Sequence, residues 1–238
     1  MNETLTLAII LIPCLIIAIV FHEVAHGLTA KMLGDPTADR LGRLSLNPLK
    51  HVDPVGTLLV PGFLALMSAP VFGWAKPVPV RKDQLDNPRF GMMAVAAAGP
   101  GTNFLLAAIG AILLGLTAPE GAQLVTSDGG FPMLAGPDGI NHLLASGLFF
   151  FILINIFLGV FNLLPIPPFD GSHIVEGLLP RRYVHFYERL QPFGMLLFFG
   201  LIALTWFAPQ LSVLENTIGP PVAWAIQQYL ALAVAISG

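Results

Sequence analysis

The N-terminal segment constrains the fold most, because a long uncharged apolar run leads directly into three ionisable side chains. Residues 5–21 contain no charged residue, and His22, Glu23 and His26 follow at once. A run of this length can cross a bilayer as an α-helix, which needs about 20 apolar residues. Ionisable side chains are costly inside such a span and mark functional sites by default. The sequence therefore predicts a membrane helix that carries a functional site near one end.

The spacing of the triplet predicts a metal site. Histidines four residues apart lie on one face of a helix, so His22 and His26 can bind the same ion. Glu23 can then reach a water molecule on that ion, as in zinc peptidases with the H-E-x-x-H pattern. The alternative is a helix in which two histidines and a salt-bridged glutamate serve only the structure. We favour the metal site because the cost of ionisable groups in an apolar span weighs against that alternative.

Composition predicts an integral membrane protein. Hydrophobic residues make up 55% of the chain and charged residues 11%, with a mean hydropathy of +0.77. An ordinary soluble domain has about 25% charged residues. A chain of 238 residues has room for five or six spans of about 20 residues, and none for an added soluble domain. The net charge of −3 argues against a nucleic-acid partner, which would need a basic surface.

Six apolar segments are the candidate spans: residues 5–28, 54–74, 91–117, 140–164, 193–207 and 221–236. The last is interrupted by Gln227 and Gln228, so it either spans the membrane or lies in its interface. We expect an all-α polytopic membrane protein with a single domain over residues 1–238. Its core is expected at residues 5–171, followed by C-terminal spans within residues 172–238.

The distribution of charge predicts the orientation. All 11 Lys and Arg residues fall in three windows, at residues 31–50, 76–89 and 181–189. Basic connections stay on the cytoplasmic side, whereas residues 118–141 contain acidic but no basic side chains and are expected outside. The N-terminus is then outside, and the metal site lies near the cytoplasmic side. We expect a multi-pass protein of the cell membrane, that is, the plasma or inner membrane.

Residues 54–74 present a conflict, because basic windows flank them on both sides. A full span would place one of those windows outside, whereas a re-entrant loop keeps both on the cytoplasmic side. Non-helical backbone at membrane depth is tolerated where protein or a water-filled cavity surrounds it. We favour a re-entrant loop broken at Pro61 and Gly62, with a full span as the alternative.

Two short segments beside this loop predict a small β element on the cytoplasmic side. Residues 43–47 alternate polar and apolar side chains, as a half-buried strand does. In residues 76–81 two prolines remove donors from one edge, so the N–H groups of Val78 and Val80 remain for pairing on the other. That edge is a candidate site for a substrate strand. The alternative is a stiff polyproline connector.

A second set of chemically active residues follows the apolar segment 140–164. Residues 162–171 read NLLPIPPFDG, and three prolines in four residues cannot continue a regular helix. Asp170 comes directly after them, at the membrane depth expected for the two histidines. A catalytic zinc takes three protein ligands, usually histidine and carboxylate. Spacing alone leaves four other carboxylates open as the third ligand, namely Asp35, Asp39, Asp53 and Glu176.

Three sequence elements together resemble the site-2 protease family of intramembrane zinc metalloproteases. They are HEVAH at residues 22–26, GPGTN at residues 99–103 and NLLPIPPFDG at residues 162–171. The first is shared with many zinc peptidases, whereas the combination in this order is specific to the family. Without a PDZ domain or a CBS pair, the chain resembles a compact branch of the family.

The resemblance implies which residues carry the chemistry. His22, His26 and Asp170 would bind one zinc ion, and Glu23 would be the catalytic acid and base. The implied activity is hydrolysis of peptide bonds in or near transmembrane segments. The implied substrates, met within the lipid bilayer, are single-span membrane proteins or the signal peptides left after protein export.

Asn103 and Asn162 also occupy motif positions of the family. They are candidates for contacts with the substrate or the transition state, because oxyanion stabilisation can use amide side chains. The alternative is a hydrogen bond between neighbouring helices. His173, three residues after Asp170, is a reserve candidate for a ligand or for a residue that orients one.

Two other classes of protein remain as alternatives. One is a membrane metal transporter, and the other is a metal-binding membrane protein without catalytic activity. A transporter is expected to carry ligands along the depth of the membrane, but residues 91–117 contain no acidic residue and no histidine. The intact triplet argues against a non-catalytic protein.

Overall fold

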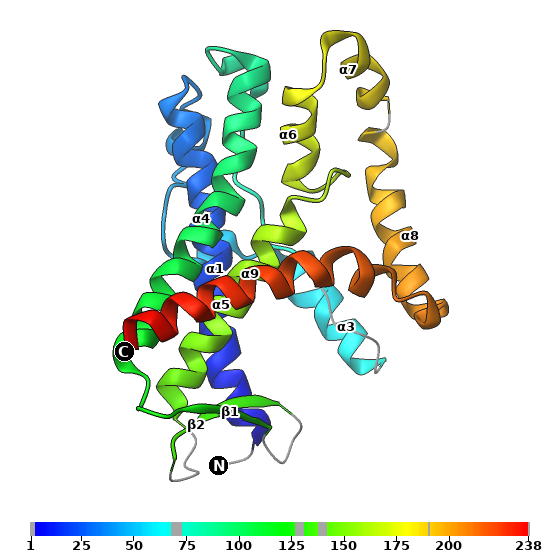
Figure 1. Ribbon diagram of the computed structural model, residues 1–238. Helices are drawn as coiled ribbons and strands as arrows, with labels where there is room; N and C mark the ends of the chain where they lie inside the picture. Colours follow the sequence, from blue (N-terminus) through cyan, green and yellow to red (C-terminus); the bar gives the residue numbers. More distant parts are fainter. Residues whose placement is uncertain (1–2, 68–72, 127–130, 138–141, 190, 238) are drawn as a thin grey trace.

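The computed structural model describes residues 3–67, 73–126, 131–137, 142–189 and 191–237, and it is dominated by α-helices (Figure 1). Three helices are long and apolar enough to cross a membrane: α1 (Glu3–Met32), α4 (Pro88–Thr117) and α5 (Leu143–Asn162). The expected count of five or six spans is not confirmed among the described residues. α8 (Gly194–Phe207) has 14 residues, fewer than a span needs, and α9 (Val213–Ser237) is not one of the candidate spans.

The remaining elements are short. In chain order they are α2 (Thr37–Arg40), η1 (Pro48–His51), η2 (Pro54–Leu59), α3 (Val60–Leu66), η3 (Lys82–Gln84), β1 (Gln123–Thr126), β2 (Pro132–Ala135), α6 (Asp170–Leu178), α7 (Arg181–Glu188), η4 (Gln191–Phe193) and η5 (Pro209–Leu211).

α4 is the central helix, because it packs against α1, α5, α6 and α9. Small residues allow this close approach, as is common between membrane helices. A Cβ atom on Gly110 would lie 3.0 Å from Ile152 of α5, and one on Gly115 would lie 2.8 Å from Ile236 of α9. The buried core between these helices consists of Ala107, Ala111, Leu114, Ala145, Ile152, Ile156, Ala225 and Ala233.

The outward faces of the long helices are apolar as well. Exposed side chains on α1 and α4 include Ile9, Ile12, Leu105, Ile109 and Leu113. Long helices satisfy their own backbone hydrogen bonds, so an apolar outer face suits them to hydrocarbon. The three long helices therefore have the surface as well as the length of membrane spans.

The long helices separate two ends of the molecule (Figure 1). The C-terminal end of α1, the start of α4, and the helices α6 and α7 lie at one end. The N-terminal end of α1 and the hairpin of β1 and β2 lie at the other, and α9 crosses the long helices between them. The basic residues of α1, α4 and α7 belong to the elements at the first end.

The two ends of the segment 54–74 lie close together. η2 and α3 together are too short to cross a bilayer, and the Trp74 N–H then donates to the Gly56 carbonyl over 3.1 Å. The predicted break at Pro61 and Gly62 is wrong, because both residues lie inside α3. Residues 68–72 of this segment lie outside the described residues.

The small β element is not where it was predicted. Residues 43–47 and 76–81 form no ladder, and the sheet in the described part of the chain is the antiparallel pair β1 and β2. Side chains and a distant carbonyl take up the backbone groups of residues 76–81 instead. Arg43 donates to the Lys76 carbonyl over 2.8 Å, and the Lys76 N–H donates to the His51 carbonyl over 2.9 Å. We call residues 76–82 the strap, because both of its ends are tied down.

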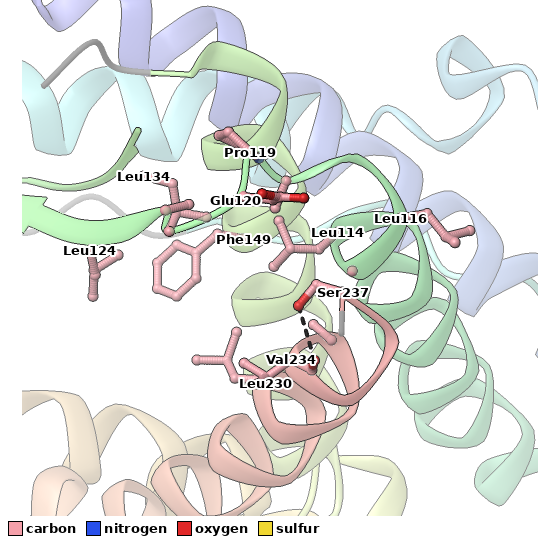
Figure 2. A pocket seen from close by; sticks show the side chains of 15 residues that line it. Leu114, Leu116, Pro119, Glu120, Leu124, Leu134, Phe149, Leu230, Val234 and Ser237 are labelled. Carbon is pink, nitrogen blue, oxygen red and sulfur yellow. Dashed lines mark hydrogen bonds between the residues drawn. The ribbon is translucent and has the colours of Figure 1, made fainter. Parts of the chain in front are cut away.

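A pocket of about 830 Å³ lies beside the hairpin, between the ends of α4 and α9 (Figure 2). Its wall is mostly apolar and includes Leu114, Leu134, Phe149 and Leu230, with Glu120 as the charged residue. No histidine lines it among the described residues. Because the histidine triplet lies near the opposite end of α1, this pocket is separate from the candidate metal centre.

Candidate metal centre

The structure brings His22, His26 and Asp170 together, from the C-terminal part of α1 and the start of α6. The two imidazole Nε2 atoms lie 3.0 Å apart, and they lie 3.2 and 3.3 Å from Asp170 Oδ2. Donor atoms about 2.0–2.1 Å from a tetrahedral zinc would lie about 3.3 Å from one another. The observed separations therefore match the donor set of a single zinc ion. The three residues form the one such group among the described residues.

The carboxylates that spacing left open are engaged elsewhere. Asp39 pairs with Lys31 over 2.8 Å, and Asp53 caps η2. Asp35 accepts hydrogen bonds from Thr37, and Glu176 pairs with Lys82. His173 Nδ1 lies 3.5 Å from Glu176 and is not part of the ligand group. The geometry thus selects Asp170, which is separated from the histidines by most of the chain.

Both imidazole rings are turned so that Nε2 is free for a metal. His26 Nδ1 lies 2.7 Å from the Val95 carbonyl, which can only accept, so Nδ1 carries the hydrogen. His22 Nδ1 lies 2.6 Å from Asn103 Oδ1. Asp170 Oδ2 is buried and has no hydrogen-bond donor among the described residues. Two nitrogen lone pairs and an unpaired carboxylate oxygen repel one another at these distances, and a cation relieves that repulsion.

Gly99 makes room for the two rings. A Cβ atom there would lie 2.6 Å from His22 Cε1 and would also collide with the ring of His26. The glycine of the GPGTN element therefore lets the backbone of α4 lie directly against the metal centre. This explains why the element contributes a glycine as well as Asn103.

Asp170 is held at the start of α6, where the helix dipole favours an acidic side chain. The prolines before it end the helical run, and Tyr187 of α7 donates to the Pro165 carbonyl over 2.6 Å. At the other end of α6, Arg89 of α4 donates to the Gly177 carbonyl over 2.9 Å. The ligand helix is thus fixed from both sides by residues that no sequence motif marked.

Glu23 lies on α1 and contacts the strap. Its Oε2 accepts a hydrogen bond of 2.7 Å from the Val78 N–H. The prediction that the Val78 N–H stays free for a substrate strand is therefore wrong, because the Glu23 side chain already accepts from it. Gly27 permits the contact, since a Cβ there would lie 2.7 Å from the Val78 side chain.

Asp35 ties the far end of the strap to the end of α1. It is fully buried, and its Oδ2 accepts from the Arg81 N–H over 2.6 Å while its Oδ1 accepts from Thr37. Burial raises the pKa of Asp35, but the hydrogen bonds from Thr37 and Arg81 outweigh it, so the pKa lies below its usual value. The carboxylate therefore stays ionised and keeps the strap in register with Glu23.

The two asparagines of the motifs lie in different places. Asn103 is fully buried between α1, α4 and α5 and contacts His22. Asn162 lies at the end of α5, and its amide nitrogen donates to the Leu158 carbonyl over 3.0 Å. Contacts of Asn162 and Asn103 with substrate stay predictions, and the structure places Asn103 against the ring of His22. Sequence reasoning missed Asn155, which also contacts Asn103, although a polar residue in an apolar span is a detectable signal.

Comparison with known proteins agrees with this geometry. Residues 10–204 match the family model described as Peptidase family M50. The chain therefore belongs to peptidase family M50, the site-2 protease family that its three motifs resemble.

Two relatives carry the names of zinc metalloproteases. The "Putative zinc metalloprotease YwhC" of Bacillus subtilis is 36% identical over 191 residues, which cover 80% of this chain and 78% of that protein. The "Putative zinc metalloprotease Rip2" of Mycolicibacterium smegmatis is 28% identical over 174 residues, which cover 71% of this chain and 56% of that protein. No solved structure matches the chain.

Proposed function

We propose that this protein is an intramembrane zinc metalloprotease that cleaves peptide bonds in or near the transmembrane segments of other membrane proteins. The observation that carries the proposal is the convergence of three ligand atoms from His22, His26 and Asp170, at 3.0–3.3 Å from one another. Glu23 follows His22 on the same helix, and membership of peptidase family M50 supplies the reaction class.

His22, His26 and Asp170 are assigned as the zinc ligands. Bound zinc supplies a Lewis acid that polarises the scissile carbonyl and makes water more acidic. Glu23 takes a proton from the attacking water and passes it to the nitrogen of the leaving amine. The Val78 N–H holds one oxygen of the Glu23 carboxylate, and we assign the proton transfer to the other.

The assignment can be tested on purified full-length protein in detergent. We expect about one zinc per chain and cleavage of a transmembrane test substrate that a chelator abolishes. Asp170→Ala should lose both zinc and cleavage, whereas Asp39→Ala, which removes only an exposed ion pair, should keep both. Retention of zinc by Asp170→Ala would contradict the ligand assignment. If the zinc-loaded protein cleaved no such substrate, the assignment as a protease would be contradicted.

The membrane topology is part of the proposal. We place the metal centre near the cytoplasmic side of the plasma or inner membrane, with five or six spans and a re-entrant loop at residues 54–74. Support for the loop comes from its two ends, which meet where Trp74 and Lys76 bond to Gly56 and His51. The basic windows on both sides of it also favour this arrangement.

Single-span membrane proteins and remnant signal peptides are the proposed substrates. A substrate helix must unwind locally before cleavage, because its own hydrogen bonds shield its carbonyls. The unwound segment can then pair with the strap at Val80, whose N–H meets no acceptor among the described residues. Pairing with Val78 as well would require its N–H to leave Glu23. Val80→Pro, which deletes the donor, should therefore raise KM for a transmembrane substrate, and an unchanged KM would contradict this binding mode.

A metal transporter is not favoured by any observation. The described residues contain a single group of metal ligands. Transport would need further ligands along the depth of the membrane.

A further inference from the structure

A buried chain of hydrogen bonds connects α5 to the metal centre. Asn155 and Asn103 are both fully buried. The Asn155 amide nitrogen donates to the Phe151 carbonyl over 2.9 Å, and its oxygen accepts from the Asn103 amide nitrogen over 3.0 Å. The Asn103 oxygen in turn lies 2.6 Å from His22 Nδ1. The chain thus runs through three helices and ends on a proposed zinc ligand.

The direction of this chain is fixed by backbone carbonyls. The Phe151 carbonyl can only accept, so it turns the nitrogen of Asn155 toward itself and the oxygen toward Asn103. The Asn103 nitrogen faces a second carbonyl as well, that of Ala18 at 3.2 Å. The Asn103 oxygen must therefore face His22. A ring nitrogen that meets an acceptor has to carry the hydrogen, so Nδ1 of His22 is protonated and Nε2 holds the lone pair.

We propose that Asn155 is a positioning residue for the metal centre, acting through Asn103 to fix the orientation of the His22 ring. The inference rests on the proposed function, since it gives Asn155 a role in binding the zinc of that site. His26 is held differently, because its partner is the backbone carbonyl of Val95, which no side-chain substitution removes. His22 is thus the ligand whose orientation depends on side chains far from the metal.

The arrangement differs from a contact that merely joins helices. Two asparagines that only join two helices can hydrogen-bond to each other and need no third partner. Here the oxygen of Asn103 is directed to His22, and Gly99, one turn earlier on α4, brings the helix close enough for the contact. Residues that orient metal-binding histidines act in this way, by fixing the ring and the position of its hydrogen.

A pair of variants with the same side-chain shape tests the role of Asn155. In Asn155→Thr the hydroxyl can accept from Asn103 and donate to the carbonyl four residues earlier, so the chain keeps its direction. Valine has the same shape as threonine, but its side chain can neither accept nor donate a hydrogen bond. We expect Asn155→Val to bind zinc about 10–100-fold more weakly than wild type, and Asn155→Thr to stay close to wild type. Zinc affinity is measured on the purified full chain in detergent, by competition with a chelating dye.

Ser146→Ala is the matched control, because Ser146 is a buried polar residue on the same helix whose Oγ accepts from Leu134. It should lower the unfolding temperature and leave zinc affinity unchanged. Equal zinc affinities for Asn155→Val and Asn155→Thr, or an equal loss in Ser146→Ala, would overturn the role of Asn155 and leave the proposed function intact. A wild-type chain that bound no zinc would overturn the proposed function and this role with it. If Asn155→Val did not fold, the smaller pair Asn155→Ser and Asn155→Ala makes the same comparison.

Discussion

At the scale of single residues, the site depends on side chains that leave one atom unpaired. The Nε2 atoms of His22 and His26 and the Oδ2 atom of Asp170 are buried, close together and without donors among the described residues. In an apolar surrounding this arrangement is unfavourable until a cation is bound. Glu23 differs from these ligands, because the strap N–H already satisfies one of its oxygens. Two variants, Glu23→Gln and Gly99→Ala, test proton transfer and zinc binding separately.

Glu23→Gln should abolish most hydrolysis without loss of zinc. Glutamine has nearly the same volume, and its carbonyl oxygen can still accept from the Val78 N–H, so the strap stays in place. It cannot accept a proton from water, and loss of a positioned general base costs about 10²-fold or more in rate. Zinc content and single-turnover cleavage of a transmembrane substrate are measured on the same preparation. Wild-type cleavage by this variant would exclude the mechanism. Zinc uptake by proteoliposomes of both proteins, without any cleavage, would favour a transporter.

Gly99→Ala should weaken zinc binding, because the new methyl group would displace both histidine rings. We expect an affinity loss of about tenfold or more, in the range found when ligand orientation is disturbed. Gly101→Ala is the control, since its Cβ would meet no atom within 4 Å. Both changes raise helix propensity, so a loss confined to Gly99→Ala cannot come from the helix itself. Equal zinc affinities for the two variants would contradict the close approach of α4.

At the scale of elements, the strap connects the parts of the site. Its Val78 N–H reaches Glu23, its Arg81 N–H reaches Asp35 at the end of α1, and its Lys82 pairs with Glu176 on the helix that carries Asp170. The strap therefore connects Glu23, the proposed general base, to the helix that carries Asp170. Its conformation comes from contacts with side chains and with the His51 carbonyl rather than from a neighbouring strand.

Asp35→Asn should lower kcat and leave zinc content unchanged. The amide keeps a single acceptor oxygen, and Thr37 offers it two donors, its N–H and its hydroxyl, where Arg81 offers one. With the oxygen on Thr37, the amide nitrogen faces the Arg81 N–H, so the strap end should detach and Val78 should no longer hold Glu23. A hydrogen bond to a charged group is worth about 1.5–3 kcal/mol, which corresponds to a loss of roughly 10–100-fold if Glu23 is fully released. Asp39→Asn, four residues along and paired only with Lys31, is the control for kcat and zinc content. A normal kcat in Asp35→Asn would show that the strap does not position Glu23.

The sequence predicted the residues of the candidate site better than it predicted the residues that contact them. The two histidines and Glu23 follow from helical spacing, which is local, whereas Asp170 needed the family resemblance because contacts across α1, α4 and α6 leave no spacing signal. The proline pattern of residues 76–81 predicted an edge strand, but the segment forms no ladder. The pattern could not indicate that Glu23 would take the remaining donor, since that contact depends on how the strap packs against Gly27. The hairpin of β1 and β2 was not predicted, because its strands have four residues each and weak alternation.

At the scale of the whole molecule, the charge pattern and the architecture agree. Among the helices labelled in Figure 1, α1, α4 and α7 carry Lys and Arg at the end of the molecule where α1 ends and α4 begins, and the hairpin with no basic residue lies at the opposite end. The metal centre sits toward the basic end. Since basic connections stay in the cytoplasm, water and product exchange are expected from that side.

Labelling of single cysteines tests this orientation together with the re-entrant loop. Cys14 is the one natural cysteine and is buried, so Cys14→Ser provides the background. We expect membrane-impermeant reagents to label exposed positions 50 and 83 only from the cytoplasmic side, and exposed position 120 only from outside. Positions 50 and 83 flank the loop, so a full span at residues 54–74 would place them on opposite sides. External labelling at 83 with cytoplasmic labelling at 50 would therefore exclude the re-entrant loop, and external labelling at both would invert the proposed orientation.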